Sequence, residues 1–103
     1  MIKGYHELKI SAIIRFLSKD EGGRFTPPSS GYKPQLKIDE VFTSCFINPK
    51  DSTLTTMEFG IDHDVFIELQ YEEAYLQRII KGMEVNLYEG NKLIGQGHIT
   101  NIQ

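Results

Sequence analysis

Apolar and polar residues alternate along several short stretches of the chain, as they do in β-strands that bury one face. The clearest stretch covers residues 6–17, where Leu8, Ile10, Ala12 and Ile14 share one face. The residues between them form a second face, which we expect to be largely in water. Shorter stretches of the same kind predict strands at residues 35–39, 41–47, 65–71, 83–89 and 92–102. The residues expected to point inward from these are Leu36, Ile38, Met83, Val85 and Leu87.

Two further stretches are ambiguous. Residues 54–59 are interpreted as another short strand, and residues 72–82 as a strand, although a turn or two of helix ending at Gly82 is an alternative. Turns are predicted at residues 48–52, 60–64 and 90–91. About six to eight short strands with closely spaced turns and almost no helix predict an all-β fold, either an antiparallel barrel or a sandwich.

Residues 17–35 interrupt the alternation with glycine, proline, serine and charged residues. The Gly22-Gly23 pair can supply the positive φ of a tight turn, and the prolines at positions 27 and 28 hold the residue before each of them extended. We therefore predict a long ordered loop with a fixed path between two strands. Loops of this length in small domains are usually functional or disordered. On the last strand, Gly95 and Gly97 suggest a bulge or a close approach of two backbones.

The size and charge of the chain narrow the classes of function. Its 103 residues predict one domain, and 40% hydrophobic and 24% charged residues are ordinary for a globular chain. A net charge of −3 argues against a nucleic-acid binder driven by electrostatics alone. A local basic patch could still form from Lys19, Arg24, Lys33 and Lys37.

The cellular compartment is inferred from the single cysteine and from the apolar segments. Cys45 excludes an internal disulfide, fits a reducing compartment and lies in an apolar run, so we expect a buried structural thiol. The first residues do not resemble a signal peptide, and no segment approaches the roughly 20 apolar residues that a membrane helix needs. We therefore expect a cytoplasmic protein without a membrane partner.

Catalytic and metal-binding patterns are missing from the sequence. The three histidines His6, His63 and His98 share no metal-ligand spacing, and His63 is interpreted as part of a solvated Asp62-His63-Asp64 turn. The chain has neither a Gly-x-Ser-x-Gly nucleophile motif nor a phosphate-binding glycine loop. We predict a protein that is not an enzyme and that has no catalytic residues, metal site or cofactor.

Three segments resemble one known family. They are LSKDEGGRFTP at residues 17–27, GYKPQ at residues 31–35 and YEGNKLIGQGHI at residues 88–99. Together they resemble the C-terminal β-barrel domain, domain III, of bacterial elongation factor Tu. The resemblance implies a closed antiparallel Greek-key barrel, present here as a stand-alone domain. In that family nucleotide binding belongs to a separate N-terminal domain, so we expect this chain to bind no GTP.

The resemblance also implies binding residues. Domain III of the family helps to hold the T-stem of aminoacyl-tRNA, packs on the GTPase domain and meets the exchange factor. By motif match, Gln35 and Glu89 fall on positions that touch the T-stem, and Arg24 falls near the surface that faces the GTPase domain. Lys33 replaces the family's arginine and keeps its charge without the planar fork. Alternatively, Gln35 and Glu89 are exposed strand ends, and Arg24 anchors the loop through backbone carbonyls.

Several positions depart from the family pattern. Phe25 stands where a histidine is usual, and Glu84 and Asn91 stand where arginines are usual, so positive charge is lost from the face implied for RNA. We predict a non-catalytic module that binds a translation-related protein or tRNA through Arg24, Lys33, Gln35 and Glu89. The alternative is a decoy or immunity-type protein that binds a toxin or factor by imitating the elongation-factor barrel.

Overall fold

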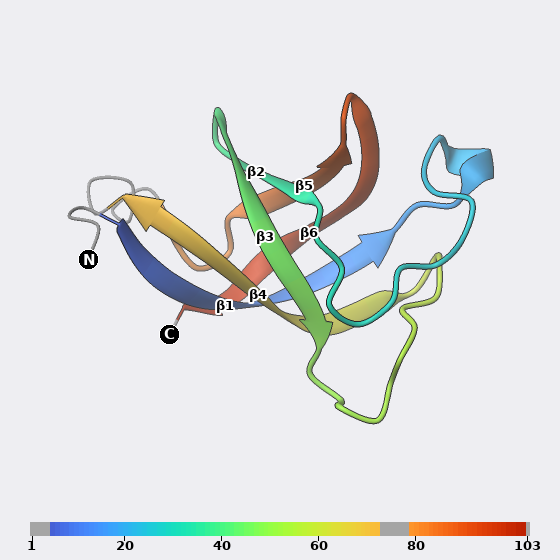
Figure 1. Cartoon of the computed structure of the whole chain (residues 1–103), viewed down its shortest axis with the longest axis horizontal. Coiled ribbons are helices and arrows are strands. Elements are labelled where there is room, and N and C mark those ends of the chain that lie inside the picture. Colours follow the sequence, from blue (N-terminus) through green and yellow to red (C-terminus); the bar gives the residue numbers. More distant parts are fainter. Residues whose placement is uncertain (1–4, 73–78, 103) are drawn as a thin grey trace.

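The computed structural model describes residues 5–72 and 79–102 and shows a closed barrel of six antiparallel strands (Figure 1). The strands are β1 (Tyr5–Phe16), β2 (Gln35–Ile38), β3 (Val41–Pro49), β4 (Asp62–Glu72), β5 (Glu84–Glu89) and β6 (Lys92–Ile102). Around the barrel they follow the order β1-β4-β3-β2-β5-β6, and β6 pairs with β1 to close it. Since β5 returns beside β2 after the consecutive strands β2 to β4, this is a Greek-key arrangement. The expected all-β barrel is confirmed, and the sandwich alternative is excluded.

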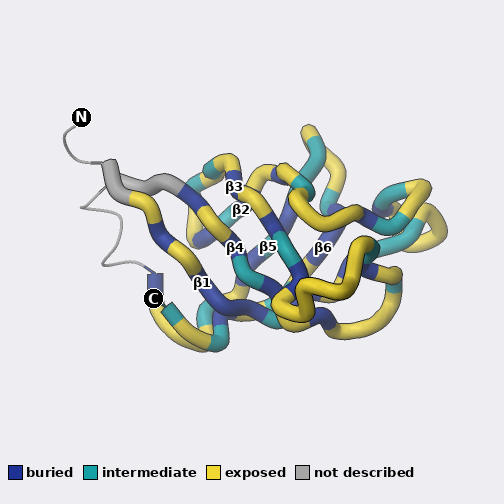
Figure 2. Tube along the Cα trace, turned by 60° about the horizontal axis from the view of Figure 1, so that its bottom comes forward, coloured by how far each residue is buried: buried dark blue, intermediate teal, exposed yellow. Residues whose placement is uncertain are grey.

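The barrel interior is filled by the strand faces that the alternation predicts. Leu8, Ile10, Ala12 and Ile14 of β1 are all buried, and buried residues recur at every second position of β1 and β4 (Figure 2). The residues predicted to point inward from β2 and β5 that are fully buried are Leu36, Ile38, Val85 and Leu87. Met83 precedes β5 and is only partly buried. Burial of these apolar side chains supplies the main driving force for closing the barrel.

The second face of β1 is drier than expected. Ser11 is buried, although its position on this face predicted contact with water. In the strand register Ser11 lies opposite Phe66 on β4 and opposite Asn101 on β6. A serine is small, so the larger neighbours on both sides leave little of it exposed to water.

Gly97 on β6 marks a close approach between two strand backbones. A Cβ atom built at Gly97 would lie 1.8 Å from the carbonyl oxygen of Ile13 on β1. The register of β6 also shifts twice, once against β1 near Ser11 and once against β5 near Leu87. Both the bulge and the close approach expected from the two glycines of β6 are therefore present, and they let β6 curve enough to close the barrel.

Residues 17–34, called the arch from here on, have a fixed path across one end of the barrel (Figure 1). The arch contains one short 3-10 turn, η1 (Lys19–Glu21), which ends at Gly22 with a φ of 87°. Backbone hydrogen bonds then join the arch to β3 through Tyr32 and Ile47, at 2.8 Å. A further bond of 2.9 Å runs from the Met57 amide to the Pro28 carbonyl. The predicted ordered loop is confirmed.

Three local expectations fail or fall outside the description. Residues 54–59 form no strand in the described structure, because their backbone bonds to the arch through an isolated bridge between Thr56 and Ser29. Residues 60–64 do not form one turn, because β4 already begins at Asp62, where it pairs with the long β1. Most of the strand expected at residues 72–82 falls on residues 73–78, which lie outside the described residues. The described parts of the chain include no helix that could cross a membrane.

His63 is the residue most affected by the earlier start of β4. It is not in a solvated turn: its side chain is buried, and its ring centroid lies 6.1 Å from that of Phe16. Its Nε2 lies 2.7 Å from the carbonyl oxygen of Glu58. A carbonyl oxygen only accepts hydrogen bonds, so Nε2 donates this one. His63 therefore closes the barrel end beneath the arch. No group of three or more potential metal ligands occurs among the described residues.

Candidate functional site

The four residues predicted to bind a partner lie in two separate environments. Arg24 belongs to the arch and Glu89 ends β5, and these two side chains contact each other. Lys33 lies at the end of the arch and Gln35 begins β2, and both are exposed on the outside of the barrel. The two pairs therefore need separate accounts.

Arg24 and Glu89 meet at Tyr32, and the three form one partly buried cluster. The Nη1 of Arg24 pairs with Oε2 of Glu89, and the Tyr32 hydroxyl donates a hydrogen bond to the same oxygen. The Arg24 guanidinium also lies 4.6 Å from the centroid of the Tyr32 ring, and its Nε donates to the Thr26 carbonyl at 3.0 Å. The Arg24 and Glu89 side chains are 23% and 34% exposed. This cluster fixes the arch to the end of β5.

The electrostatics of the cluster keep Arg24 charged and Tyr32 neutral. Burial raises the pKa of the Tyr32 hydroxyl well above its usual value, and the hydrogen bond to Glu89 raises it further. For Arg24, burial lowers the pKa, but the hydrogen bond and charge of Tyr32 and the charge of Glu89 outweigh it and leave the pKa raised. Arg24 thus acts as the anchor of the arch, both through a backbone carbonyl and through Glu89.

Replacing Glu89 should loosen the arch. We expect Glu89→Ala to lower the free energy of unfolding by about 1–3 kcal/mol, because Arg24 and Tyr32 lose the acceptor that they share. The exposure of the pair favours the lower part of this range. Urea denaturation measures the loss, and amide hydrogen exchange of residues 24–32 should accelerate. Glu84→Ala is the matched control, since Glu84 is an exposed glutamate on the same strand; an equal loss in both variants would contradict the role of the cluster.

Lys33 and Gln35 lie on the outer face of the sheet formed by β3, β2 and β5. Gln35 pairs in register with Ser44 on β3 and with Tyr88 on β5, and its Nε2 donates to Ser44 Oγ at 3.1 Å. The Nζ of Lys33 lies 4.9 Å from the ring centroid of Phe46. Both predicted residues are therefore placed against β3 on the outside of the barrel.

The aromatic residues beside Lys33 and Gln35 were missed by the sequence analysis. Phe42 and Phe46 are 53% and 46% exposed, and the Phe42 ring makes an edge contact with Tyr88 at 5.5 Å between centroids. Their signal was present in the alternation of β3, where Phe42, Ser44 and Phe46 occupy every second position and the buried Cys45 and Ile47 fix the opposite face. Two exposed aromatic side chains therefore lie on one outer face of the barrel.

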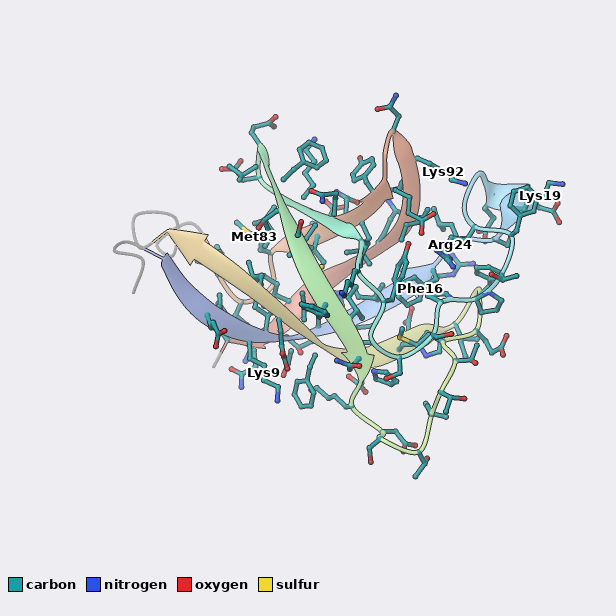
Figure 3. All side chains as sticks on the ribbon, viewed as in Figure 1. Lys9, Phe16, Lys19, Arg24, Met83 and Lys92 are labelled. Carbon is teal, nitrogen blue, oxygen red and sulfur yellow. The ribbon has the colours of Figure 1, made fainter. Side chains whose placement is uncertain are left out.

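The four basic residues expected to share a patch do not act as a single cluster, because each lies over a different ring. Lys19 lies over Phe25, Arg24 over Tyr32, Lys33 over Phe46 and Lys37 over Phe42. Phe25 is 74% exposed and also has Lys92 of β6 at 6.0 Å, and Lys19, Arg24 and Lys92 appear on the arch side of the molecule (Figure 3). The positive charge is thus divided between the arch and the outer face of β2.

Cys45 is a buried thiol, as expected, and its chemistry is that of a core residue. It is 3% exposed, and burial raises the pKa of its thiol to about 12. Only the thiolate reacts readily with disulfide reagents, so the folded chain should react with DTNB much more slowly at pH 8 than the chain in 6 M guanidinium. In the unfolded chain the thiol ionises near its ordinary pKa of about 8.5, whereas in the folded chain it stays neutral up to about 12. The free energy of unfolding should therefore decrease as pH rises from about 8.5 towards 12. Equal reaction rates in the folded and unfolded chains would contradict this placement.

No protein-family model matches the chain.

Proposed function

We propose that this chain is a non-catalytic binding module of the type of elongation factor Tu domain III, engaging a translation-related protein or tRNA. The observation that carries the proposal is the convergence of the three segments that resemble that family. Arg24 comes from the first segment, Tyr32 from the second and Glu89 from the third, and their side chains contact one another. A resemblance read from separate stretches thus corresponds to one structural unit.

The structure supports different roles for the four residues of the proposed site. Arg24 and Glu89 form an ion pair with each other. Their role is therefore to hold the arch and the end of β5 in the shape that a partner would contact. Lys33 and Gln35 are exposed, and their polar groups can reach a partner. An amide can both donate and accept hydrogen bonds with a ribose or a phosphate, and an ammonium can pair with a phosphate or a carboxylate.

Binding of tRNA tests the nucleic-acid arm of this proposal. The full chain is mixed with aminoacylated and uncharged tRNA at low and at raised salt, and binding is followed by fluorescence anisotropy. Binding should weaken with salt and be reduced by Lys33→Glu and by Gln35→Ala, whereas Lys50→Glu, an exposed lysine at the far end of β3, is the control. Absent binding, or binding insensitive to salt, would reject the tRNA role.

Affinity purification tests the protein arm. The tagged chain should recover translation factors from a cell extract, and recovery should fall for Lys33→Glu. Recovery of a single toxin-like protein would instead support the decoy function. We also expect GTP to leave the melting temperature of the chain unchanged, because the family that it resembles binds nucleotide through a separate N-terminal domain. A clear GTP-dependent shift would contradict this expectation.

A further inference from the structure

The outer face of β2 and β3 carries a regular ladder of paired side chains. Lys33, Gln35 and Lys37 follow one another at every second position, and Phe46, Ser44 and Phe42 lie beside them on β3. Lys37 lies 5.7 Å from the ring centroid of Phe42, as Lys33 lies 4.9 Å from that of Phe46. We call these six residues the Lys–Phe ladder: its two Lys–Phe rungs flank one hydrogen-bonded Gln–Ser rung.

The charge of the ladder is opposite to that of the whole chain. The chain has a net charge of −3, yet none of the six ladder positions holds a carboxylate. The nearest acidic residues in sequence, Asp39 and Glu40, lie in the turn between β2 and β3. The ladder is therefore a small surface with two positive charges and two exposed aromatic rings. Asp39 and Glu40 bound one end of it, and Glu68 of β4 lies opposite Phe46 near the other.

A groove adjoins the ladder at its Lys33–Phe46 rung. It has a volume of about 920 Å³, and its lining includes Lys33 and Phe46 together with the apolar residues Leu8, Cys45 and Leu69. Lys9, Glu7 and Glu68 also line it, so its rim has charges of both signs. An apolar side chain of a partner could enter this groove while a neighbouring carboxylate pairs with Lys33.

We propose that the Lys–Phe ladder docks a partner protein through an extended segment in which acidic residues alternate with apolar ones. This inference rests on the proposed binding function and names its partner class. The segment would run between the lysine row on the β2 side and the phenylalanine row on β3, so that its successive side chains project to opposite sides. Its acidic residues then pair with Lys33 and Lys37, while the apolar ones contact the exposed edges of Phe42 and Phe46 and enter the groove. An extended segment fits because outward positions on a strand repeat about every 7 Å, which matches every second residue of another extended chain.

A protein partner is favoured over a single-stranded nucleic acid because lysine side chains already lie over the rings of Phe42 and Phe46. Bases bind to aromatic side chains by stacking on their open faces. Here a lysine ammonium lies over each phenylalanine ring, and Tyr88 makes an edge contact with Phe42. Carboxylates can pair with the two ammonium groups without displacing them from the rings.

The test is an NMR titration of the ¹⁵N-labelled full chain with a synthetic peptide of alternating glutamate and leucine. A lysine–leucine peptide of the same length and a single-stranded oligouridylate are titrated in parallel. We expect the glutamate–leucine peptide to shift the amides of residues 33–37 and 42–46. The Kd should rise about tenfold or more in Lys33→Glu/Lys37→Glu, since two weak ion pairs become repulsions. A similar rise is expected in Phe42→Ser/Phe46→Ser.

The matched control moves the same changes to the arch, where Lys19 lies over the exposed Phe25. Lys19→Glu/Phe25→Ser should leave the Kd for the glutamate–leucine peptide within about twofold of the unmodified chain. These side chains are exposed except for that of Lys37, which is half-buried. An unchanged unfolding midpoint verifies that each variant folds. Three results would overturn the docking inference: no shifts at the ladder, equal binding of the lysine–leucine peptide, or stronger binding of oligouridylate at the same amides. This titration contains neither tRNA nor translation factors. A negative result would therefore reject the docking inference without rejecting the proposed function, which the tRNA-binding and affinity-purification experiments test separately.

Discussion

Gly97→Ala is expected to destabilise the barrel by at least about 3 kcal/mol, which is a large share of the stability of a domain of this size. The added Cβ would lie 1.8 Å from the carbonyl oxygen of Ile13 and 2.8 Å from Cδ1 of Ile14. The oxygen belongs to the backbone of β1, so it cannot move without displacing the pairing between β1 and β6. That pairing closes the barrel, and the variant should therefore lose the closure itself.

Gly95→Ala is the graded control for this prediction. A Cβ at Gly95 would lie 3.1 Å from Cδ1 of Leu87 and 3.2 Å from Cδ1 of Phe16, which are side-chain atoms that can shift by a few tenths of an ångström. We expect this variant to lose no more than about half as much stability as Gly97→Ala. Urea denaturation of both variants measures the difference. If Gly97→Ala matched Gly95→Ala, the backbones of β1 and β6 could not be as close as described.

The regular part of the fold could be predicted because it depends on local alternation. In β1 and β5 every second residue is apolar, and the β5–β6 hairpin has its turn at Gly90-Asn91. The glycines of β6 were also informative, since a glycine within a strand usually has a reason in packing. In each of these cases neighbouring residues along the chain contain the whole signal.

The start of β4 could not be predicted because a polar sequence conceals it. Asp62, His63 and Asp64 read as a turn, but they pair with the last residues of β1, and the buried His63 is satisfied by the Glu58 carbonyl. A strand can include such residues when a long partner strand extends beside it. Nothing within the three residues reveals the length of β1.

The candidate site was predicted as a set of residues but not as an arrangement. Arg24 and Glu89 are 65 residues apart, and their contact exists only because the arch crosses the barrel end beside β5. Gln35 is exposed at the start of β2, as the alternative interpretation of this residue expected, and Lys33 is exposed beside it. The aromatic half of the ladder was missed. The structure shows that Cys45 and Ile47 of β3 point inward. The alternate residues Phe42 and Phe46 therefore point outward.

Phe16→Ala is expected to lower the free energy of unfolding by about 3–5 kcal/mol and to release the arch. Phe16 is fully buried at the end of β1, and its ring centroid lies 6.3 Å from that of Tyr32 and 6.1 Å from that of His63. Removing the ring leaves a cavity beneath the arch that these two side chains cannot fill without moving. Urea denaturation measures the loss, and amide hydrogen exchange should accelerate across residues 17–34 before it does so in β2.

Phe42→Ala removes the same ring from the outside of the barrel and is the matched control. Phe42 is 53% exposed, so we expect a loss below about 1 kcal/mol and no change in exchange within the arch. The two variants separate the two positions of phenylalanine in this chain, because Phe16 packs beneath the arch in the core and Phe42 lies on the outer face of the barrel. A small loss in Phe16→Ala, or unchanged exchange of the arch in that variant, would show that the Arg24–Tyr32–Glu89 contacts fix the arch without support from the core.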